Sequence, residues 1–348
     1  MDNVKKEKQG VLARFQELWK TTPLFSTGIA LIVMVVVQTL ALTFNSSYDS
    51  FGGWFVNWLN NWISLLRGNA AIGIISLGMT FVIISGGIDL SVGSVYVAVG
   101  AFTMVLLDTG AGGWLGALGL GGVPAILIAL VAAMLFGSLL GEGNGLLISY
   151  GKMPPFIATL GSMQILRSVT QYFMKTQSPS LPDGYKEIAR FSIGGQQLMP
   201  ILYWAIAAAV MYFVSKHTTF GRYVYAIGSN ERTTRLSGVN VRKVKRRVYA
   251  LTGLLVAIAA IIQTSRIGSM DYASAGSGFE MDAIAAVIVG GTSMSGGRGS
   301  VIGTVFGTLI VAVMNNLLNL IGVDPYLSSA FKGAIIICAV LLQRKDNN

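Results

Sequence analysis

Apolar runs of about 15 to 26 residues recur along the chain, separated by short polar or glycine-rich stretches. A run of about 20 apolar residues crosses the hydrocarbon of a bilayer as one helix. The charges that bound these runs predict about ten spans and leave no room for a large domain outside the membrane. The predicted spans are 23–44, 67–89, 89–108, 122–147, 156–173, 200–214, 247–266, 283–297, 298–321 and 326–342. The pattern is typical of an all-α, polytopic membrane protein.

Composition agrees with this interpretation and excludes several classes of function. Hydrophobic residues make up 53% of the 348 residues and charged residues only 11%, which is atypical of a soluble enzyme. The formal net charge is +10, but the basic residues lie in loops beside the spans, so nucleic-acid binding is not expected. Cys338 is the single cysteine and His217 the single histidine, so we expect neither a disulfide framework nor a metal site.

The distribution of basic residues predicts the orientation in the membrane. With ten spans and a cytoplasmic N-terminus, 18 of the 25 Lys and Arg residues fall on the cytoplasmic side. Residues 1–22 are then a cytoplasmic segment, 23–343 the transmembrane domain and 344–348 a cytoplasmic tail. Residues 51–66 contain three tryptophans, which favours an aromatic belt at the outer interface.

Two stretches of the sequence resemble each other. Glycine motif 1, ISGGIDLSVGSV at 84–95, resembles glycine motif 2, IVGGTSMSGGRGSV at 288–301. Residues 144–156 and 316–326 form a second similar pair in the same order. An inverted internal repeat, typical of transporters, competes here with chance similarity between glycine-rich segments.

Glycine-interrupted spans at matching positions indicate a transport pathway, although glycines also permit close helix packing. The series at 137, 141 and 145 and at 299, 303 and 307 is expected to pack helices. Motif 2 lacks the Gly-Lys-Ser/Thr ending of a phosphate loop, so the chain itself is not expected to bind ATP. The candidates for lining the pathway are small or polar residues in the spans: Gly86, Gly87, Asp89, Ser91, Asn144, Thr292, Ser293, Asn315 and Asn316.

Residues 216–247 form the largest loop predicted to face the cytoplasm. They contain nine Lys and Arg residues and one acid, Glu231. The pattern predicts a turn at 228–230, a short helix over 231–236, a stop at Gly238 and a second helix that enters the next span. This loop either fixes the topology only or docks on another protein.

The ordered motifs TFVIISGGIDLSVGS, MPPFIATLGSM, FGRYVYAIGSNERTTRLSGVNV and GFEMDAIAAVIVGGTSMSGGRGSVIGTVFGTL identify a family. Over about residues 70–343 the chain resembles the membrane permease subunits of ABC importers for ribose, galactosides and related simple sugars. In this family the loop with the AIGSNERTTRLSGV pattern is the segment that couples the permease to its ATPase. The resemblance implies coupling roles for Asn230, Glu231, Arg232, Thr233, Leu236, Ser237, Gly238 and Val239. Family members often carry small apolar residues at 232 and 233, where this chain has Arg and Thr.

The resemblance also implies partners and a location. A permease subunit of this kind is not an enzyme and works in a prokaryotic inner membrane with an ATP-binding subunit, which holds ATP and Mg²⁺. A sugar-binding protein outside the membrane delivers a monosaccharide or simple glycoside, with ribose favoured. A second copy of the permease and membrane lipid complete the assembly. The alternative is a stand-alone secondary transporter or channel, for which paired carboxylates within the membrane are expected.

Overall fold

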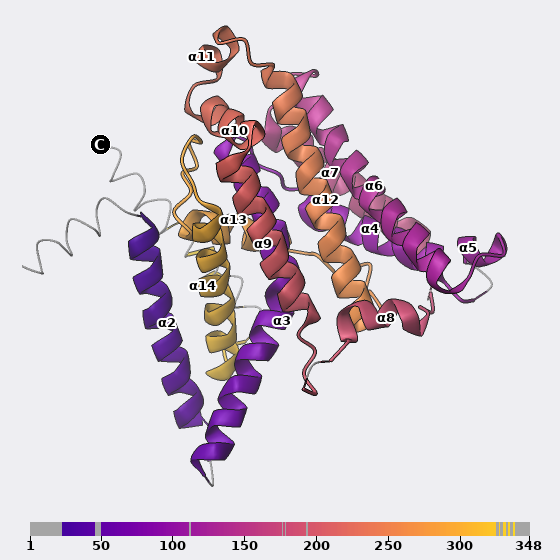
Figure 1. The fold of residues 1–348 in the computed structure, drawn as a ribbon, viewed down its shortest axis with the longest axis vertical. Helices are drawn as coiled ribbons and strands as arrows, with labels where there is room; N and C mark the ends of the chain where they lie inside the picture. The colour runs from indigo at the N-terminus through magenta and orange to yellow at the C-terminus, as the bar shows by residue number, and fades with distance from the viewer. Residues whose placement is uncertain are drawn as a thin grey trace, which may run out of the picture.

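Helices account for all the secondary-structure elements in the part of the chain that the computed structural model describes. That part comprises residues 23–45, 50–110, 113–175, 177, 179–192 and 194–324 and the positions 327, 330, 331, 333, 334 and 337. The longer helices lie side by side as a bundle (Figure 1). The helices are α2 (Pro23–Asn45), α3 (Phe51–Ile84), α4 (Val92–Leu107), α5 (Trp114–Ala117), α6 (Gly122–Ser149), α7 (Pro155–Met174), α8 (Asp183–Arg190), α9 (Met199–His217), α10 (Thr219–Ser229), α11 (Glu231–Leu236), α12 (Val241–Ile267), α13 (Phe279–Val289) and α14 (Val301–Leu320).

Six of these helices are long and apolar enough to cross a membrane, namely α2, α3, α6, α9, α12 and α14. α4 is apolar but shorter, and α7 has 20 residues but is less apolar than the six. The structure thus describes an all-helical membrane protein, while the number of ten spans is not confirmed. The predicted tenth span, with Cys338, lies largely outside the described residues, as do the two terminal segments.

The second predicted span starts much earlier than expected. α3 is a single helix of 34 residues, so residues 51–66 are its first half and continue into the predicted span. The indole N–H of Trp54 donates to Thr43 Oγ1 (3.0 Å) and that of Trp58 donates to Thr39 Oγ1 (3.1 Å). α2 therefore runs beside this half of α3, and its hydroxyl groups accept hydrogen bonds from two of the three tryptophans that the sequence assigned to the interface.

The predicted eighth span, 283–297, is wrong, because α13 ends at Val289. An α-helix of 11 residues is about 16 Å long, too short to cross the hydrocarbon alone. Residues 268–278, which precede it, run beside α4 without a helix. A Cβ at Gly93 would lie 2.2 Å from the carbonyl oxygen of Gly276, so the two backbones touch. A non-helical segment and a short helix thus replace the continuous span.

α12 is the central helix, and it packs against α3, α4, α6 and α8. Glycines permit its close contact with α6: a Cβ at Gly141 would lie 2.2 Å from the carbonyl oxygen of Tyr249, and one at Gly253 would lie 2.1 Å from that of Gly137. On α14, a Cβ at Gly307 would lie 2.0 Å from the carbonyl oxygen of Ala286. The packing role predicted for both glycine series is confirmed.

The bundle has two distinct ends. α10 and α11 lie at one of them, and α8 lies at the other (Figure 1). We call these the α11 end and the α8 end. At the α8 end, Tyr185 of α8 is fully buried, and its hydroxyl bonds Thr264 Oγ1 of α12 (2.6 Å). The side chain of Arg190 donates to the carbonyl oxygens of Arg266 and Ile267. α8 thus closes the C-terminal end of α12.

Candidate functional site

The two glycine motifs meet at the α11 end. The amide of Gly297 in motif 2 donates to the carbonyl oxygen of Ile84, where α3 ends at motif 1 (2.9 Å). Gly228, near the end of α10, packs into the same junction, where a Cβ would lie 1.7 Å from that carbonyl oxygen. The phenol of Tyr225 on α10 donates to the carbonyl oxygen of Gly299 (3.0 Å). α10, which leads to α11, therefore packs directly against both motifs.

The helix ends at the two motifs have the same geometry. At motif 1, Gly86 has φ +79° and the amide of Gly87 donates to the carbonyl oxygen of Val82. At motif 2, Gly291 has φ +85° and the amide of Thr292 donates to the carbonyl oxygen of Val287. A left-handed residue after a helix with such a bond five residues back is a Schellman-type cap. Both motifs lie at the same end of the bundle, so the glycine motifs themselves are not inverted relative to each other.

Three of the predicted pathway residues form one buried polar chain that starts within motif 1. Asp89 Oδ1 accepts hydrogen bonds from the amide (2.9 Å) and the hydroxyl (2.6 Å) of Ser91. The amide group of Asn144 on α6 donates to Ser91 Oγ (2.8 Å), and its oxygen accepts from Ser162 on α7. Asp89, Ser91 and Asn144 are almost completely buried. This chain fixes the loop after α3 against α6 and α7.

The other predicted pathway residues lie in two further places. Thr292 is buried and Ser293 half-buried in motif 2, where the amide of Ser293 donates to the carbonyl oxygen of Arg298 (3.0 Å). Asn315 and Asn316 lie near the far end of α14, and Asn316 donates to Asn61 of α3 (2.9 Å). The candidates therefore form three separate groups within one copy of the chain. Gly86 is exposed and Gly87 half-buried.

Arg167 lies within the predicted fifth span, where a charged side chain is costly. Its hydrogen bonds explain why the charge is placed there. Its guanidinium donates to the carbonyl oxygens of Ala273 (3.3 Å) and Ala275 (2.9 Å). These carbonyls belong to the non-helical segment 268–278, which cannot satisfy them within a helix. The side chain thus replaces helical hydrogen bonds where the crossing is interrupted.

α7 also has a polar face that the sequence analysis did not single out. Gly161, Gln164 and Ser168 are exposed in the single chain, and their spacing puts them on one side of the helix. Of the described helices with 18 or more residues, α7 alone lacks an 18-residue stretch apolar enough to cross a membrane. This low hydropathy is the feature of the sequence that could have predicted the face. A polar face on a helix inside a membrane bundle requires water or a protein partner.

The short helix predicted over 231–236 is confirmed as α11, Glu231–Leu236. Gly228 and Ser229, expected in a turn, instead belong to α10, and Asn230 separates the two helices. The side chain of Asn230 caps α11 by accepting from the amide of Thr233 (2.9 Å). Gly238 has φ +82° and ends the helix, as predicted, because glycine takes this conformation without steric cost. The local sequence alone specifies this unit.

An ion-pair cluster anchors α11 to α12. Glu231 pairs with Arg235 of α11 and with Lys245 of α12, each at 2.7 Å. The hydrogen bond from Lys245 and the positive charges of both partners outweigh burial and hold the pKa of Glu231 below its ordinary value. One carboxylate therefore sets the position of the short helix on the longer one.

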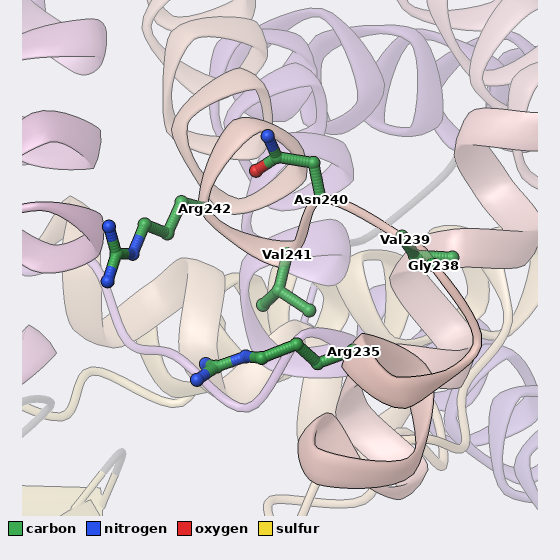
Figure 2. Close-up of a pocket in the computed structure, with 6 residues that line it drawn as sticks. All are labelled: Arg235, Gly238, Val239, Asn240, Val241 and Arg242. Carbon is green, nitrogen blue, oxygen red and sulfur yellow. The ribbon is translucent and has the colours of Figure 1, made fainter.

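The tip of α11 is an exposed surface of mixed chemistry. Leu236 is 81% exposed. Arg232, Thr233, Ser237 and Gly238 are also exposed, while Val239 is half-buried. Figure 2 shows Arg235 and Arg242 extending to the same side of a cavity of about 340 Å³, which Gly238 to Val241 also line. The exposed surface of α11 thus combines one apolar side chain with polar and cationic groups.

These features together define a membrane permease in which α10 and α11 form an exposed arm at one end of the bundle. The bundle supplies several spans with glycine-lined breaks, and α10 and α11 link those breaks to an exposed surface.

Comparison with known proteins gives the family. A family described as "Branched-chain amino acid transport system / permease component" matches residues 61–340. The ribose import permease protein RbsC of Escherichia coli (strain K12) is 37% identical over 326 residues, which cover 91% of this chain and 92% of the relative. RbsC of Bacillus subtilis (strain 168) is 41% identical over 290 residues, which cover 82% and 85%. The xylose transport system permease protein XylH of Haemophilus influenzae (strain ATCC 51907 / DSM 11121 / KW20 / Rd) is 33% identical over 344 residues, which cover 81% and 88%.

This chain belongs to that family of permease components, and the resemblance drawn from its motifs is confirmed. It is a membrane permease subunit of an ABC importer and not an enzyme.

Proposed function

We propose that the chain forms the membrane pathway for a monosaccharide, with a pentose such as ribose as the first candidate. Two of the three relatives above are named as ribose permeases and the third as a xylose permease. The polar groups that the bundle contributes are mainly neutral amides and hydroxyls. Neutral groups suit a sugar because they exchange hydrogen bonds with it without holding it as tightly as a charged cage.

The pathway forms between two copies of the chain, with the polar face of α7 toward it. Gly161, Gln164 and Ser168 provide small and amide or hydroxyl groups at membrane depth, where lipid would leave them unsatisfied. Asp89, Ser91 and Asn144 support the pathway from behind, since Ser162 of α7 bonds Asn144. The non-helical segment 268–278 and motif 2, with Thr292 and Ser293, flank it from the other side. Asn315 and Asn316 belong to its outer part.

The α11 end faces the cytoplasm in this proposal, and the α8 end faces outward. Lys152 and the basic residues of 216–247 lie at the α11 end, as the positive-inside rule requires. α2 begins at the same end, since Thr27 donates to the carbonyl oxygen of Val289 (3.3 Å), so the N-terminus is cytoplasmic. The sugar-binding protein docks at the α8 end. The C-terminus and the inner-membrane location follow the expectation from the sequence.

Coupling to ATP hydrolysis runs through α11 and α10. The ATP-binding subunit, which carries ATP and Mg²⁺, seats around Leu236 with Asn230, Glu231, Arg232, Thr233, Ser237, Gly238 and Val239. The observation that carries this proposal is the junction of Gly228 with Ile84 and Gly297. A movement of α11 passes through this junction to both glycine motifs at once, because the backbones touch there without intervening side chains.

Uptake into vesicles tests the function. The permease is reconstituted with its ATP-binding subunit, ATP is enclosed on the side of that subunit, and a binding protein loaded with radiolabelled ribose or xylose is added outside. We expect uptake only with all components and with ATP. Uptake by the permease alone would make it a secondary transporter or channel and would overturn the proposal. A complex that transports neither pentose but another sugar would correct the substrate only.

A further inference from the structure

A long apolar groove runs between α9 and α12. It forms a cavity of about 440 Å³ with little polar lining. Leu251, Leu254, Leu255, Ile258, Ile261 and Ile262 of α12 form one wall. Tyr203, Ile206, Ala207, Val210 and Met211 of α9 form the other. Ile188 of α8 closes the groove at the α8 end, and Leu130 and Met134 of α6 border it.

A second cavity continues the groove toward the α11 end. It measures about 160 Å³ and lies between α10 and α12, where Tyr223, Asn240, Lys243 and Arg247 line it together with apolar residues. Lys243, Arg247, Leu251, Leu254 and Ile258 follow one another at spacings of three or four residues, so they lie on one face of α12. The two cavities thus lie in line along this face of α12, and together we call them the track, which has a cationic end and an apolar body.

The dimensions of the track match one leaflet of a bilayer. The apolar part extends from Leu251 to Ile262, about 16 Å along the helix. Half of the hydrocarbon thickness is about 15 Å. An acyl chain of the cytoplasmic leaflet therefore fills the apolar part when its headgroup lies beside Lys243 and Arg247.

Charge decides the kind of headgroup. No acidic residue lines the cavity that contains Lys243 and Arg247. The acids of the described residues at this end are engaged elsewhere: Glu231 pairs with Arg235 and Lys245, Glu142 pairs with Arg246, and Asp89 binds Ser91. Among its described residues, a second copy of the chain would thus bring no free carboxylate from this end, whereas a phosphate group complements both cations.

We propose that this track binds one anionic phospholipid of the cytoplasmic leaflet, with the orientation inferred under Proposed function. Its headgroup contacts Lys243 and Arg247, and one acyl chain lies between α9 and α12. Because the headgroup also touches α10, the lipid ties α10 to α12 on the two sides of α11. An anionic bilayer is then expected to reduce the movement of α10 and α11 relative to α12.

Lipid retention tests the binding site in the intact permease. Wild-type protein is purified from vesicles of phosphatidylglycerol and phosphatidylcholine with equal acyl chains, and bound lipid is counted by native mass spectrometry. We expect one retained lipid per chain with a preference for phosphatidylglycerol of about twenty-five-fold, since each of the two cations contributes roughly a factor of five. Lys243→Gln with Arg247→Gln removes this preference. Lys216→Gln with Arg222→Gln, a matched loss of two exposed cations that do not line the track, retains it.

Two variants that fill the groove test the place of the acyl chain. Ala207→Trp fills the groove from the wall formed by α9, and Leu254→Trp fills it from the wall formed by α12. If one variant fails to fold, the other still tests the proposal. Either is expected to lose the retained lipid of both headgroup types. Equal phosphatidylglycerol preference in the glutamine variant and its control, or unchanged lipid in both tryptophan variants, would overturn the proposal. Loss of the permease dimer in the tryptophan variants would show that a second copy covers the groove and would overturn it as well. Uptake plays no part in these readouts, so their outcome is independent of the sugar assignment.

Discussion

The amide of Gly297 donates a hydrogen bond to the carbonyl oxygen of Ile84, which joins residues from opposite halves of the chain. Ile84 ends α3 and Gly297 belongs to motif 2, so this bond closes the two glycine motifs against each other. Gly228 lies over the same bond with no room for a side chain. At this point α10 therefore touches both glycine motifs.

Gly228→Ala tests this junction. A Cβ there would lie 1.7 Å from the carbonyl oxygen of Ile84, so α10 must move away. Overpacking of this kind costs about 1–3 kcal/mol. We expect normal insertion but a lower ratio of sugar transported to ATP hydrolysed, measured in the reconstituted complex. Gly143→Ala is the matched control, because a Cβ at Gly143 meets nothing within 4 Å. An unchanged ratio in the Gly228 variant would mean that coupling bypasses the junction.

Gly238→Val tests the cap of α11. The space around Gly238 is open, so the effect is conformational, and the left-handed φ of +82° costs a residue other than glycine about 1–2 kcal/mol. Membrane insertion should stay near wild type while sugar-dependent ATP hydrolysis and uptake fall sharply. Gly238→Asn, which tolerates this conformation, should retain most of the activity. If hydrolysis and uptake persist with valine, residues 230–239 are an ordinary loop.

Asn144→Ala tests the buried polar chain. The change leaves Ser91 and Ser162 without their bonds to Asn144 and should lower the free energy of unfolding by about 1–3 kcal/mol. Thermal unfolding of the purified permease measures this loss. The double variant with Ser162→Ala should lose less than the sum of the single losses, because the two residues share one bond. Strictly additive losses would argue against the contact.

Glu231→Gln tests the anchor of α11 by pH. The pKa of Glu231 is lowered in the folded protein, so its ion pairs stabilise the fold above the unfolded pKa of about 4.5 and lose this effect as pH falls through the folded pKa. The side chain is partly exposed, so we expect a difference of only about 0.2–1 kcal/mol between wild type and the glutamine variant. Thermal unfolding from pH 8 to pH 4 should show this difference at high pH and its decline below about pH 4.5. A difference that grows on acidification would contradict the ion-pair assignment.

Cysteine labelling tests the orientation. In a Cys338→Ser background, a cysteine in place of Ser180 at the α8 end should react with an impermeant reagent in whole cells. A cysteine in place of Ser237 beside α11 should react only after lysis. Both serines are exposed, so access to the reagent depends on the side of the membrane. The reverse pattern would invert the proposed topology and move the ATPase to the other end.

α11 shows how far the sequence leads. Its helix, its cap at Asn230 and its stop at Gly238 all depend on residues within a few positions, so local patterns predicted them. The resemblance of the motifs then indicated the family, which the relatives confirm. The packing glycines were predictable as well, because small residues at helical spacing serve few other purposes in an apolar run.

The sequence by itself determined the helical class, the apolar runs and the short helix α11 with its cap and stop, since hydropathy and turn-forming residues act locally. Only the tertiary structure decided that α3 continues through residues 51–66, where hydroxyl groups of α2 satisfy Trp54 and Trp58. It also decided that α13 stops at Val289 and that Arg167 supports the non-helical segment before it. Hydropathy cannot predict these features, because each depends on hydrogen bonds between residues that are distant in the chain and meet only in the folded bundle.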